Sequence, residues 1–330
     1  LSTPDYPKHL LTVNGGAKSL VQNTYERAKL TSDKVFVITD SSHAHHVKKQ
    51  LPELPEDSFI IEPARRGTAS CIVAGLERIS RVSMDEPVAF IAADHYIRDS
   101  KGFAHSFKVA AEASIKQGKI VLVGVEPDHA ATGFGYIEKG DLEDEGNFVF
   151  SVKEFKEKPD YKLAQQYLRS GNYLWNCGYF VGSVETFLKV MKKFASNLAE
   201  DYQLLCGAKT PEDYKRVYLG FENISIDYAL IERVNDLLVV QATFDWMDVG
   251  SYSDLHKAVV SDEKGNHMHG EIEVEDVQNS FVQNYDNKPV AVIGLDNVVV
   301  VNTKHGLVVA RKDMSQAIGD VAKRIHSKER

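Results

Sequence analysis

The chain has 330 residues, of which 43% are hydrophobic and 26% charged, enough for one large domain with a small appendage, or for two domains. Its net charge of −8 gives no support for a basic nucleic-acid-binding surface, so we expect no nucleic-acid partner. No apolar run approaches the ~20 residues that cross a bilayer, and no charged and apolar leader opens the chain. Because its three cysteines also lack the spacing of a metal site, we expect a cytoplasmic protein with no membrane partner.

Strand-like and helix-like segments alternate through the first 125 residues. The predicted strands are 34–39, 59–62, 88–92 and 120–125, and the predicted helices are 19–30, 69–83 and 102–117. Short apolar strands between amphipathic helices are typical of βαβ units. They predict an α/β fold with a Rossmann-like, mixed but largely parallel sheet flanked by helices. Such sheets bind ligands beyond the carboxyl ends of their strands, and Asp94 lies just after the third predicted strand.

The second half of the chain changes character twice. The predicted elements are β segments over 133–181 with an inserted helix at 161–170, helices over 184–234, a helix from about Ser251, β segments over 271–310, and a closing helix from about Met314. This pattern predicts a large domain at 1–260 and a small β-rich C-terminal module at 261–330.

Two short blocks carry polar side chains suited to a sugar phosphate. Residues 155–159 end a predicted strand with Glu157 and Lys158, followed by a proline that has no N–H for a ladder. Residues 175–178 place Asn176 close to a glycine, where backbone can approach a ligand. The carboxylate and the amide suit sugar hydroxyls, and the ammonium suits a phosphate. From these blocks alone, a surface charge cluster beside a buried tryptophan explains the pattern equally well.

Further blocks along the chain extend this pattern in a recognisable order. They are Glu62–Ala69 (EPARRGTA), Ala92–His95 (AADH), Thr132–Ile137 (TGFGYI), Ser225–Tyr228 (SIDY) and Trp246–Ser251 (WMDVGS). Together the blocks resemble those of the sugar-nucleotide pyrophosphorylases, and within that family the chain is most similar to the mannose-1-phosphate guanylyltransferases over nearly its whole length. The resemblance implies a nucleotidyltransferase that joins GTP and mannose 1-phosphate into GDP-mannose and releases pyrophosphate. It also implies that the C-terminal module is a short left-handed β-helix.

The resemblance implies Mg²⁺ as the cofactor and Asp94 and Asp248 as catalytic metal ligands. Both substrates are highly negative, so charge neutralisation and positioning supply most of the catalysis. Without the resemblance, each aspartate fits a turn or helix-cap residue. Asp245 competes with Asp248 in sequence, but Asp248 occupies the matching place in the motif.

The resemblance assigns Lys8, a third catalytic residue, to the nucleotide or its departing pyrophosphate; the alternative is a solvated lysine before a strand. It assigns Arg66 and Thr68 to nucleotide binding. Thr68 lies at a predicted helix start, where backbone N–H groups suit a purine edge or a phosphate. The family more often has Asn where this chain has Gly67, which weakens the case for a side-chain contact to the base there.

Six residues are assigned to mannose 1-phosphate by the same resemblance. They are Gly133 and Tyr136, which close over the sugar, Glu157 for its hydroxyls, Lys158 for its phosphate, and Asn176 and Asp227 for the sugar. For Asp227, a place near the metal and a role as the cap of a helix from Tyr228 remain open alternatives.

The family opens with a strand and a glycine-rich loop, which binds the triphosphate, whereas this chain opens at Leu1–Pro4, just downstream of the matching position. Two explanations are open, an upstream segment of about 20 residues and a true truncation. We expect the upstream segment, because a sheet without a central strand would expose unpaired backbone. Two rival functions remain: a sugar-1-phosphate nucleotidyltransferase that uses dTTP, UTP or ATP, and a non-catalytic relative that binds a sugar nucleotide. The β-rich module makes a homodimer the expected oligomer.

Overall fold

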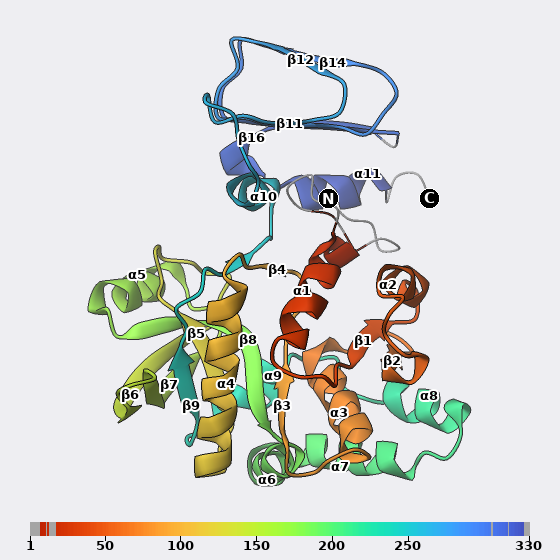
Figure 1. Cartoon of the computed structure of the whole chain (residues 1–330), viewed down its shortest axis with the longest axis vertical. Coiled ribbons are helices and arrows are strands. Elements are labelled where there is room, and N and C mark those ends of the chain that lie inside the picture. The colour runs from red at the N-terminus through yellow and green to blue at the C-terminus, as the bar shows by residue number, and fades with distance from the viewer. Residues whose placement is uncertain (1–6, 11, 13–17, 305, 316, 327–330) are drawn as a thin grey trace. The chain divides into compact units, whose positions relative to one another are not determined.

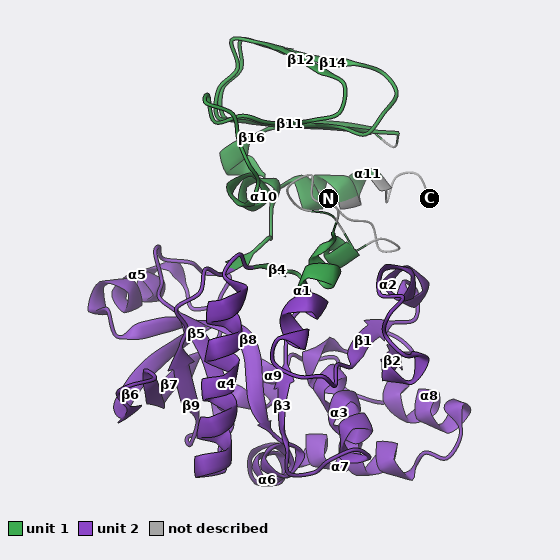
Figure 2. Ribbon diagram, viewed as in Figure 1, with its two compact units in different colours: residues 1–23, 94–96, 247–330 green, residues 24–93, 97–246 purple. Residues whose placement is uncertain are grey.

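The computed structural model describes residues 7–10, 12, 18–304, 306–315 and 317–326. The chain opening at Leu1–Pro4, on which the expectation of an upstream segment rests, lies outside the described residues. The chain divides into two compact units, which Figure 2 colours separately. Unit 1 comprises residues 1–23, 94–96 and 247–330, and unit 2 comprises residues 24–93 and 97–246.

Unit 2 is built around a six-stranded sheet. In spatial order its strands are β3 (Pro87–Phe90), β8 (Tyr173–Ser183), β5 (Val121–Val125), β9 (Leu238–Gln241), β7 (Val149–Lys156) and β6 (Tyr136–Asp144). Among the described residues of this sheet, β5 and β9 form the one parallel pair, and the other pairings are antiparallel. The mixed α/β fold class is confirmed, but the prediction of a largely parallel sheet is wrong.

The position of β8 explains the difference. β3 and β5 are connected through α4 (Ser100–Gln117) and run in the same direction, as a βαβ unit requires. β8 lies between them and is antiparallel to both, and β6 and β7 add an antiparallel hairpin. The alternation of elements predicts the direction of β3 and β5 correctly. It does not indicate that a later strand inserts between them.

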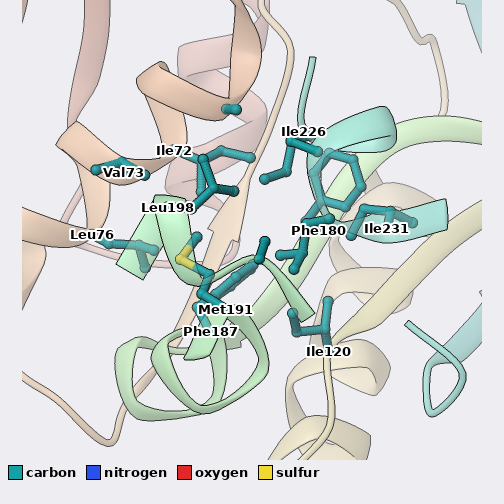
Figure 3. Packing of buried hydrophobic residues seen from close by; sticks show 14 of the residues in the cluster. Ile72, Val73, Leu76, Ile120, Phe180, Phe187, Met191, Leu198, Ile226 and Ile231 are labelled. Carbon is teal, nitrogen blue, oxygen red and sulfur yellow. The ribbon is translucent and has the colours of Figure 1, made fainter. Parts of the chain in front are cut away.

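Helices cover both faces of this sheet because alternate residues of a strand point to opposite sides. Leu122 of β5 belongs to a hydrophobic cluster with α3, α6, α7, α8 and α9, part of which Figure 3 shows. Val121 and Val123 belong to a second cluster with α4 and α5. The bounds are α3 Gly67–Ser80, α5 Tyr161–Ser170, α6 Val184–Phe194, α7 Ser196–Gly207, α8 Pro211–Leu219 and α9 Ile226–Ala229, which a 3₁₀ turn at Ile231–Arg233 follows. Unit 2 is therefore a three-layer α/β/α structure.

Two further strands of unit 2 form a separate parallel pair, β1 (Val37–Asp40) and β2 (Phe59–Glu62). The neighbouring elements are α1 (Leu20–Lys29), which crosses the boundary between the units, α2 (Ala44–Gln50) and a 3₁₀ turn at Glu56–Ser58. β3 ends the six-stranded sheet, and β1 pairs only with β2 within the described part of the chain. One backbone edge of β1 and one of β3 thus lack a strand partner among these residues.

The C-terminal part of unit 1 is a β-helix. Its strands are β11 (His267–His269), β12 (Ile272–Glu275), β13 (Phe281–Asn284), β14 (Val290–Ile293), β15 (Val298–Thr303) and β16 (Gly306–Arg311). β11, β13 and β15 stack in parallel, as do β12 and β14, and Figure 1 shows the resulting coils. β16 returns antiparallel to β15. The predicted C-terminal β module is confirmed, and its left-handed sense stays a prediction.

Short elements complete unit 1. They are a 3₁₀ turn at Lys8–Leu10, β4 (His95–Tyr96), β10 (Met247–Asp248), α10 (Tyr252–Ala258), a 3₁₀ turn at Lys312–Met314 and α11 (Ala317–His326). Ser251 and Asp254 form a capping box at the start of α10, close to where the sequence predicts a helix to begin. No helix in the described part of the chain is long and apolar enough to span a membrane.

Candidate active site

Three charged side chains from distant parts of the sequence meet in unit 1. Nζ of Lys8 lies 2.9 Å from Oδ1 of Asp248 and 3.6 Å from Oδ2 of Asp94. The antiparallel pairing of β4 with β10 places His95 opposite Asp248, and Asp94 is the residue before β4. The structure thus brings together the three residues that the sequence assigns to catalysis.

The surroundings of Asp94 favour its ionised form. Burial is the largest single influence and opposes ionisation, but His95, Lys8 and a backbone hydrogen bond outweigh it and hold the pKa of Asp94 below its ordinary value. Nε2 of His95 lies 3.9 Å from Oδ1 of Asp94. The side chains of Asp94 and Asp248 are still 42% and 35% exposed, so a ligand can reach both carboxylates.

The donors in this cluster fit Mg²⁺ that arrives with a nucleotide. Mg²⁺ keeps several waters and binds proteins through one or two carboxylates together with substrate phosphate oxygens. Among the residues that the structure describes, no group of three or more His, Cys, Asp or Glu side chains is arranged to hold a metal ion. Asp94 and Asp248 provide a two-carboxylate set, which suits a shared site better than an all-protein cage.

Asp245, the competitor of Asp248 in sequence, has a different environment. Its Oδ2 accepts a hydrogen bond from Nε of Arg98 at 2.9 Å, and its Oδ1 accepts from the backbone N–H groups of Arg98 and Asp99 at 3.0 and 2.8 Å. These bonds outweigh the opposing effect of burial and lower the pKa of Asp245. Asp245 therefore anchors the turn before α4, and its oxygens are already engaged.

A second group of polar side chains lies in unit 2 at the end of β7. The side chain of Glu157 is buried, and its Oε1 lies 3.0 Å from Nζ of Lys158. This hydrogen bond raises the pKa of Lys158, so the ammonium group stays charged. Lys158 is half exposed, and its φ of 45° is in the left-handed region that L-residues rarely adopt. Such strained residues occur frequently at binding sites.

Asn176 of β8 and Asp227 of α9 belong to the same group. Nδ2 of Asn176 donates to Oδ1 of Asp227 at 3.0 Å, and Oδ1 of Asn176 accepts the N–H of Gly178 at 3.0 Å. Burial, and then the charge of Glu157, raises the pKa of Asp227 to about 6. The cap of α9 is Ser225, so Asp227 does not cap this helix. The polar group defined by Glu157, Lys158, Asn176 and Asp227 is called the unit 2 pocket below.

The loop before β6 contributes differently from expectation. A Cβ at Gly135 would lie 2.5 Å from Oε2 of Glu157, whereas a Cβ at Gly133 would meet no heavy atom within 4 Å. The side chain of Tyr136 is fully buried, and its hydroxyl donates to the carbonyl oxygen of Ala131 at 2.9 Å. Gly135 is therefore the glycine that the pocket requires. Tyr136 holds the loop from inside the core and would have to leave the core to touch a sugar.

The turn before α3 holds the predicted nucleotide residues. Nε of Arg66 is buried and has no hydrogen-bond partner among the described residues, so a ligand could use this donor. Gly67 has a φ of 77°, and a Cβ there would lie 2.2 Å from the carbonyl oxygen of Ile224. A side chain at this position would collide with the backbone of Ile224, so the turn requires a glycine here.

The side chain of Thr68 is engaged within the protein. Its Oγ1 accepts the N–H of Ile226 at 2.9 Å, and the N–H of Ala69 donates to Ile224 at 3.3 Å. Some of the hydrogen-bonding capacity that the sequence assigns to a ligand at this helix start is therefore used by residues 224–226.

Glu232 contacts the end of β7 next to the unit 2 pocket, and no sequence pattern points to this residue. Its Oε1 accepts hydrogen bonds from Nζ of Lys156 at 3.2 Å and from the N–H of Glu157 at 3.0 Å. These bonds fix the end of β7 where Glu157 leaves the strand. Glu232 stands alone in a helical segment without a motif, so the sequence carries no signal for this role.

The chain matches two protein-family models. The model of nucleotidyl transferases matches residues 2–265, and the model of the MannoseP isomerase/GMP-like beta-helix domain matches residues 271–325. Because the first match covers most of the chain, the chain belongs to the nucleotidyl transferase family, a family of enzymes.

Relatives with curated names indicate which kind of nucleotidyl transferase the chain is similar to. Xanthan biosynthesis protein XanB of Xanthomonas campestris pv. campestris (strain B100) is 34% identical over 99% of this chain and 70% of its own length. Mannose-1-phosphate guanylyltransferase RfbM of Salmonella typhimurium (strain LT2) is 33% identical over 96% of this chain and 67% of its own length. The crystal structure of mannose-1-phosphate geranyltransferase from Thermus thermophilus superposes with a TM-score of 0.88 at 26% identity, covering 99% of this chain and 94% of that one. The chain is thus similar to these proteins in sequence and in fold.

Proposed function

We propose that this protein transfers the guanylyl group of GTP to mannose 1-phosphate and so forms GDP-mannose and pyrophosphate. The observation that carries the reaction class is the convergence of Asp94 and Asp248 on Lys8. Support for these substrates comes from relatives at 33–34% identity that are named mannose-1-phosphate guanylyltransferase.

The chemistry needs positioning and charge more than a proton acceptor. A phosphate oxygen of mannose 1-phosphate attacks the α-phosphorus of GTP. A new P–O bond forms, the bond to the bridging oxygen of the β-phosphate breaks, and pyrophosphate leaves with the electron pair. The attacking oxygen is already anionic, so the protein must mainly hold two anions together and offset their repulsion.

In this proposal the ammonium group of Lys8 neutralises part of the triphosphate charge. Asp94 and Asp248 hold Mg²⁺, which when bound supplies further positive charge to the phosphates. The lowered pKa of Asp94 keeps its carboxylate ionised at neutral pH, as a metal ligand must be. The buried Nε of Arg66, which has no hydrogen-bond partner among the described residues, is offered to the nucleotide.

We propose that the sugar phosphate binds in the unit 2 pocket. The exposed, charged ammonium of Lys158 binds the phosphate, and the buried carboxylate of Glu157 accepts hydrogen bonds from sugar hydroxyls. Asp227 lies beside Glu157 and accepts further hydroxyl hydrogen bonds, while Asn176 orients it. A Cβ at Gly133 would meet no heavy atom of the described residues within 4 Å, so the sugar can approach the backbone there.

The decisive test is pyrophosphate release from GTP, mannose 1-phosphate and Mg²⁺ with the full-length protein. We expect turnover with GTP and much less with dTTP, UTP or ATP. Preference for one of those nucleotides would make the protein another sugar-1-phosphate nucleotidyltransferase. Binding of GDP-mannose without any turnover would contradict the proposal and favour a non-catalytic sugar-nucleotide-binding role.

We also propose that residues 1–260 form the catalytic domain and residues 261–330 a small module through which the protein forms a cytoplasmic homodimer. The three cysteines are free, which fits a reducing compartment. Light scattering should give the mass of two chains, and a single-chain mass would contradict the dimer.

A further inference from the structure

A short segment, residues 222–227, joins the start of α3 to the unit 2 pocket and is called the connecting segment below. At its first end, Ile224 accepts the N–H of Ala69 at 3.3 Å, and Oγ of Ser70 donates to the carbonyl oxygen of Glu222 at 3.4 Å. At its other end, Asp227 accepts the amide hydrogen bond of Asn176. Both ends lie in unit 2.

Thr68 makes the shortest bond between α3 and this segment, the 2.9 Å bond from the N–H of Ile226 to its Oγ1. The side chain of Ile226 is fully buried in the hydrophobic cluster that also contains Ile72 and Phe180, as Figure 3 shows. The hydrogen bond of its N–H and the burial of its side chain therefore fix the position of Ile226, the residue directly before Asp227.

The position of Asp227 needs such support because it is electrostatically unfavourable. Asp227 is placed near Glu157, and two carboxylates in a partly buried pocket repel each other. A backbone hydrogen bond, the charge of Lys158 and the hydrogen bond from Asn176 offset only part of this cost. A backbone held from the side of α3 supplies a further restraint.

We propose that Thr68 is a positioning residue for the sugar-phosphate pocket: its hydroxyl holds the Ile226 N–H and thereby sets the Asp227 carboxylate against Asn176. This inference rests on the proposed function and moves Thr68 from the nucleotide side to the sugar side. The close approach at Gly67 belongs to the same arrangement, because a side chain there would push Ile224 away from α3.

The test replaces the hydroxyl without changing the shape of the side chain. Thr68→Val removes the acceptor, and Thr68→Ser keeps it. We expect Thr68→Val to raise KM for mannose 1-phosphate about tenfold, as for one lost hydrogen bond, while KM for GTP changes by less than about twofold, and Thr68→Ser to restore the wild-type values. If Thr68→Val raises KM for GTP instead, or if Thr68→Ser raises KM for mannose 1-phosphate as much as Thr68→Val does, the inference is wrong.

A second measurement is independent of catalysis. The carboxyl group of Asp227 can be titrated by NMR without substrate in the wild type and in Thr68→Val. We expect its pKa to move from about 6 toward the ordinary value in the variant, because the released carboxylate turns away from Glu157. An unchanged titration would overturn the inference even if the enzyme makes GDP-mannose. Conversely, a wild-type protein that binds no mannose 1-phosphate would defeat the proposed function, while a shifted titration would still uphold the positioning by Thr68.

Discussion

The cluster in unit 1 and the pocket in unit 2 both contain an aspartate that matches a family motif, but their surroundings act in opposite directions. Asp94 is partly exposed beside Lys8 and His95, and its pKa is lowered. Asp227 lies beside Glu157, and burial together with the charge of Glu157 raises its pKa to about 6. Neighbouring positive charge holds Asp94 as an anion, whereas Asp227 takes up a proton at a higher pH than an ordinary aspartate does.

This difference follows from how each site is assembled. The unit 1 cluster gathers one cation and two anions, which leaves its carboxylates free to bind an added cation. The unit 2 pocket gathers two carboxylates, one ammonium and one amide whose hydrogen bonds are mostly internal. The first arrangement suits charge neutralisation, and the second suits recognition of hydroxyls and one phosphate.

The largest effect is expected at Asp94. Asp94→Ala should reduce turnover by about 10³-fold or more, because metal-based charge neutralisation is the largest catalytic contribution. Pyrophosphate release measures the rate, and circular dichroism checks that the partly exposed position leaves the fold intact. Near-normal turnover would remove Asp94 from the metal site.

Lys158→Ala tests the other region. We expect KM for mannose 1-phosphate to rise by about 10–100-fold, as for the loss of a charged hydrogen bond, with KM for GTP nearly unchanged. Lys153→Ala is the matched control, because Lys153 is an exposed lysine of β7, the strand that ends just before Lys158, and it pairs with Glu138. If KM changes for GTP and not for mannose 1-phosphate, Lys158 is assigned to the wrong substrate.

Backbone strain offers a way to disturb unit 2 without touching a charged group. Gly67→Ala places a Cβ against Ile224 at a positive φ, so we expect a loss of about 2 kcal/mol or more in the free energy of unfolding. Gly118→Ala is the control: its φ is also positive, at 63°, but no atom lies near its Cβ, and only about 1 kcal/mol should be lost. Equal losses in chemical denaturation would mean that the contact with Ile224 is not close in solution.

The smallest effect concerns pH. The pKa of Asp227 is raised from 3.8 to about 6 in the folded protein, so the folded state binds this proton more tightly than the unfolded state. The group therefore costs stability as the pH rises from about 4 to 6, and the cost stays constant above that range. Asp227→Asn keeps the acceptor for Asn176 and should stabilise the protein by on the order of 1 kcal/mol at pH 7.5 but not at pH 4.

Asp94→Asn should change the stability of the protein in the opposite direction. Because the pKa of Asp94 is lowered, its carboxylate contributes stability above the unfolded pKa, and this contribution is lost as the pH falls through the folded value. Thermal melts across this pH range should therefore show a destabilised Asp94→Asn at neutral pH beside a stabilised Asp227→Asn. Shifts of the same sign for both variants would contradict the comparison.

The sequence predicts local elements and motif positions well. β2 and α5 match the predicted bounds, and the direction of β3 relative to β5 follows from the helix between them. The insertion of β8 between those strands could not be predicted, because it depends on a long-range pairing that periodicity does not encode.

For the site, motif order leads to Asp94 and Asp248, but only the fold shows that Lys8 lies between them. The sequence does not show which partners within the protein a candidate side chain contacts. The bond of Thr68 to Ile226 and the burial of Tyr136 arise from packing between segments far apart in the chain.

The central claim is that Asp94 and Asp248 share one cation at the phosphates of the nucleotide. A crystal structure of the full-length protein with Mg²⁺ and a non-hydrolysable GTP analogue tests it most directly. We predict one Mg²⁺ within about 2.1 Å of an oxygen from each carboxylate and in contact with phosphate oxygens. A nucleotide-bound Mg²⁺ held by other residues, with these two carboxylates apart from it, would contradict the account.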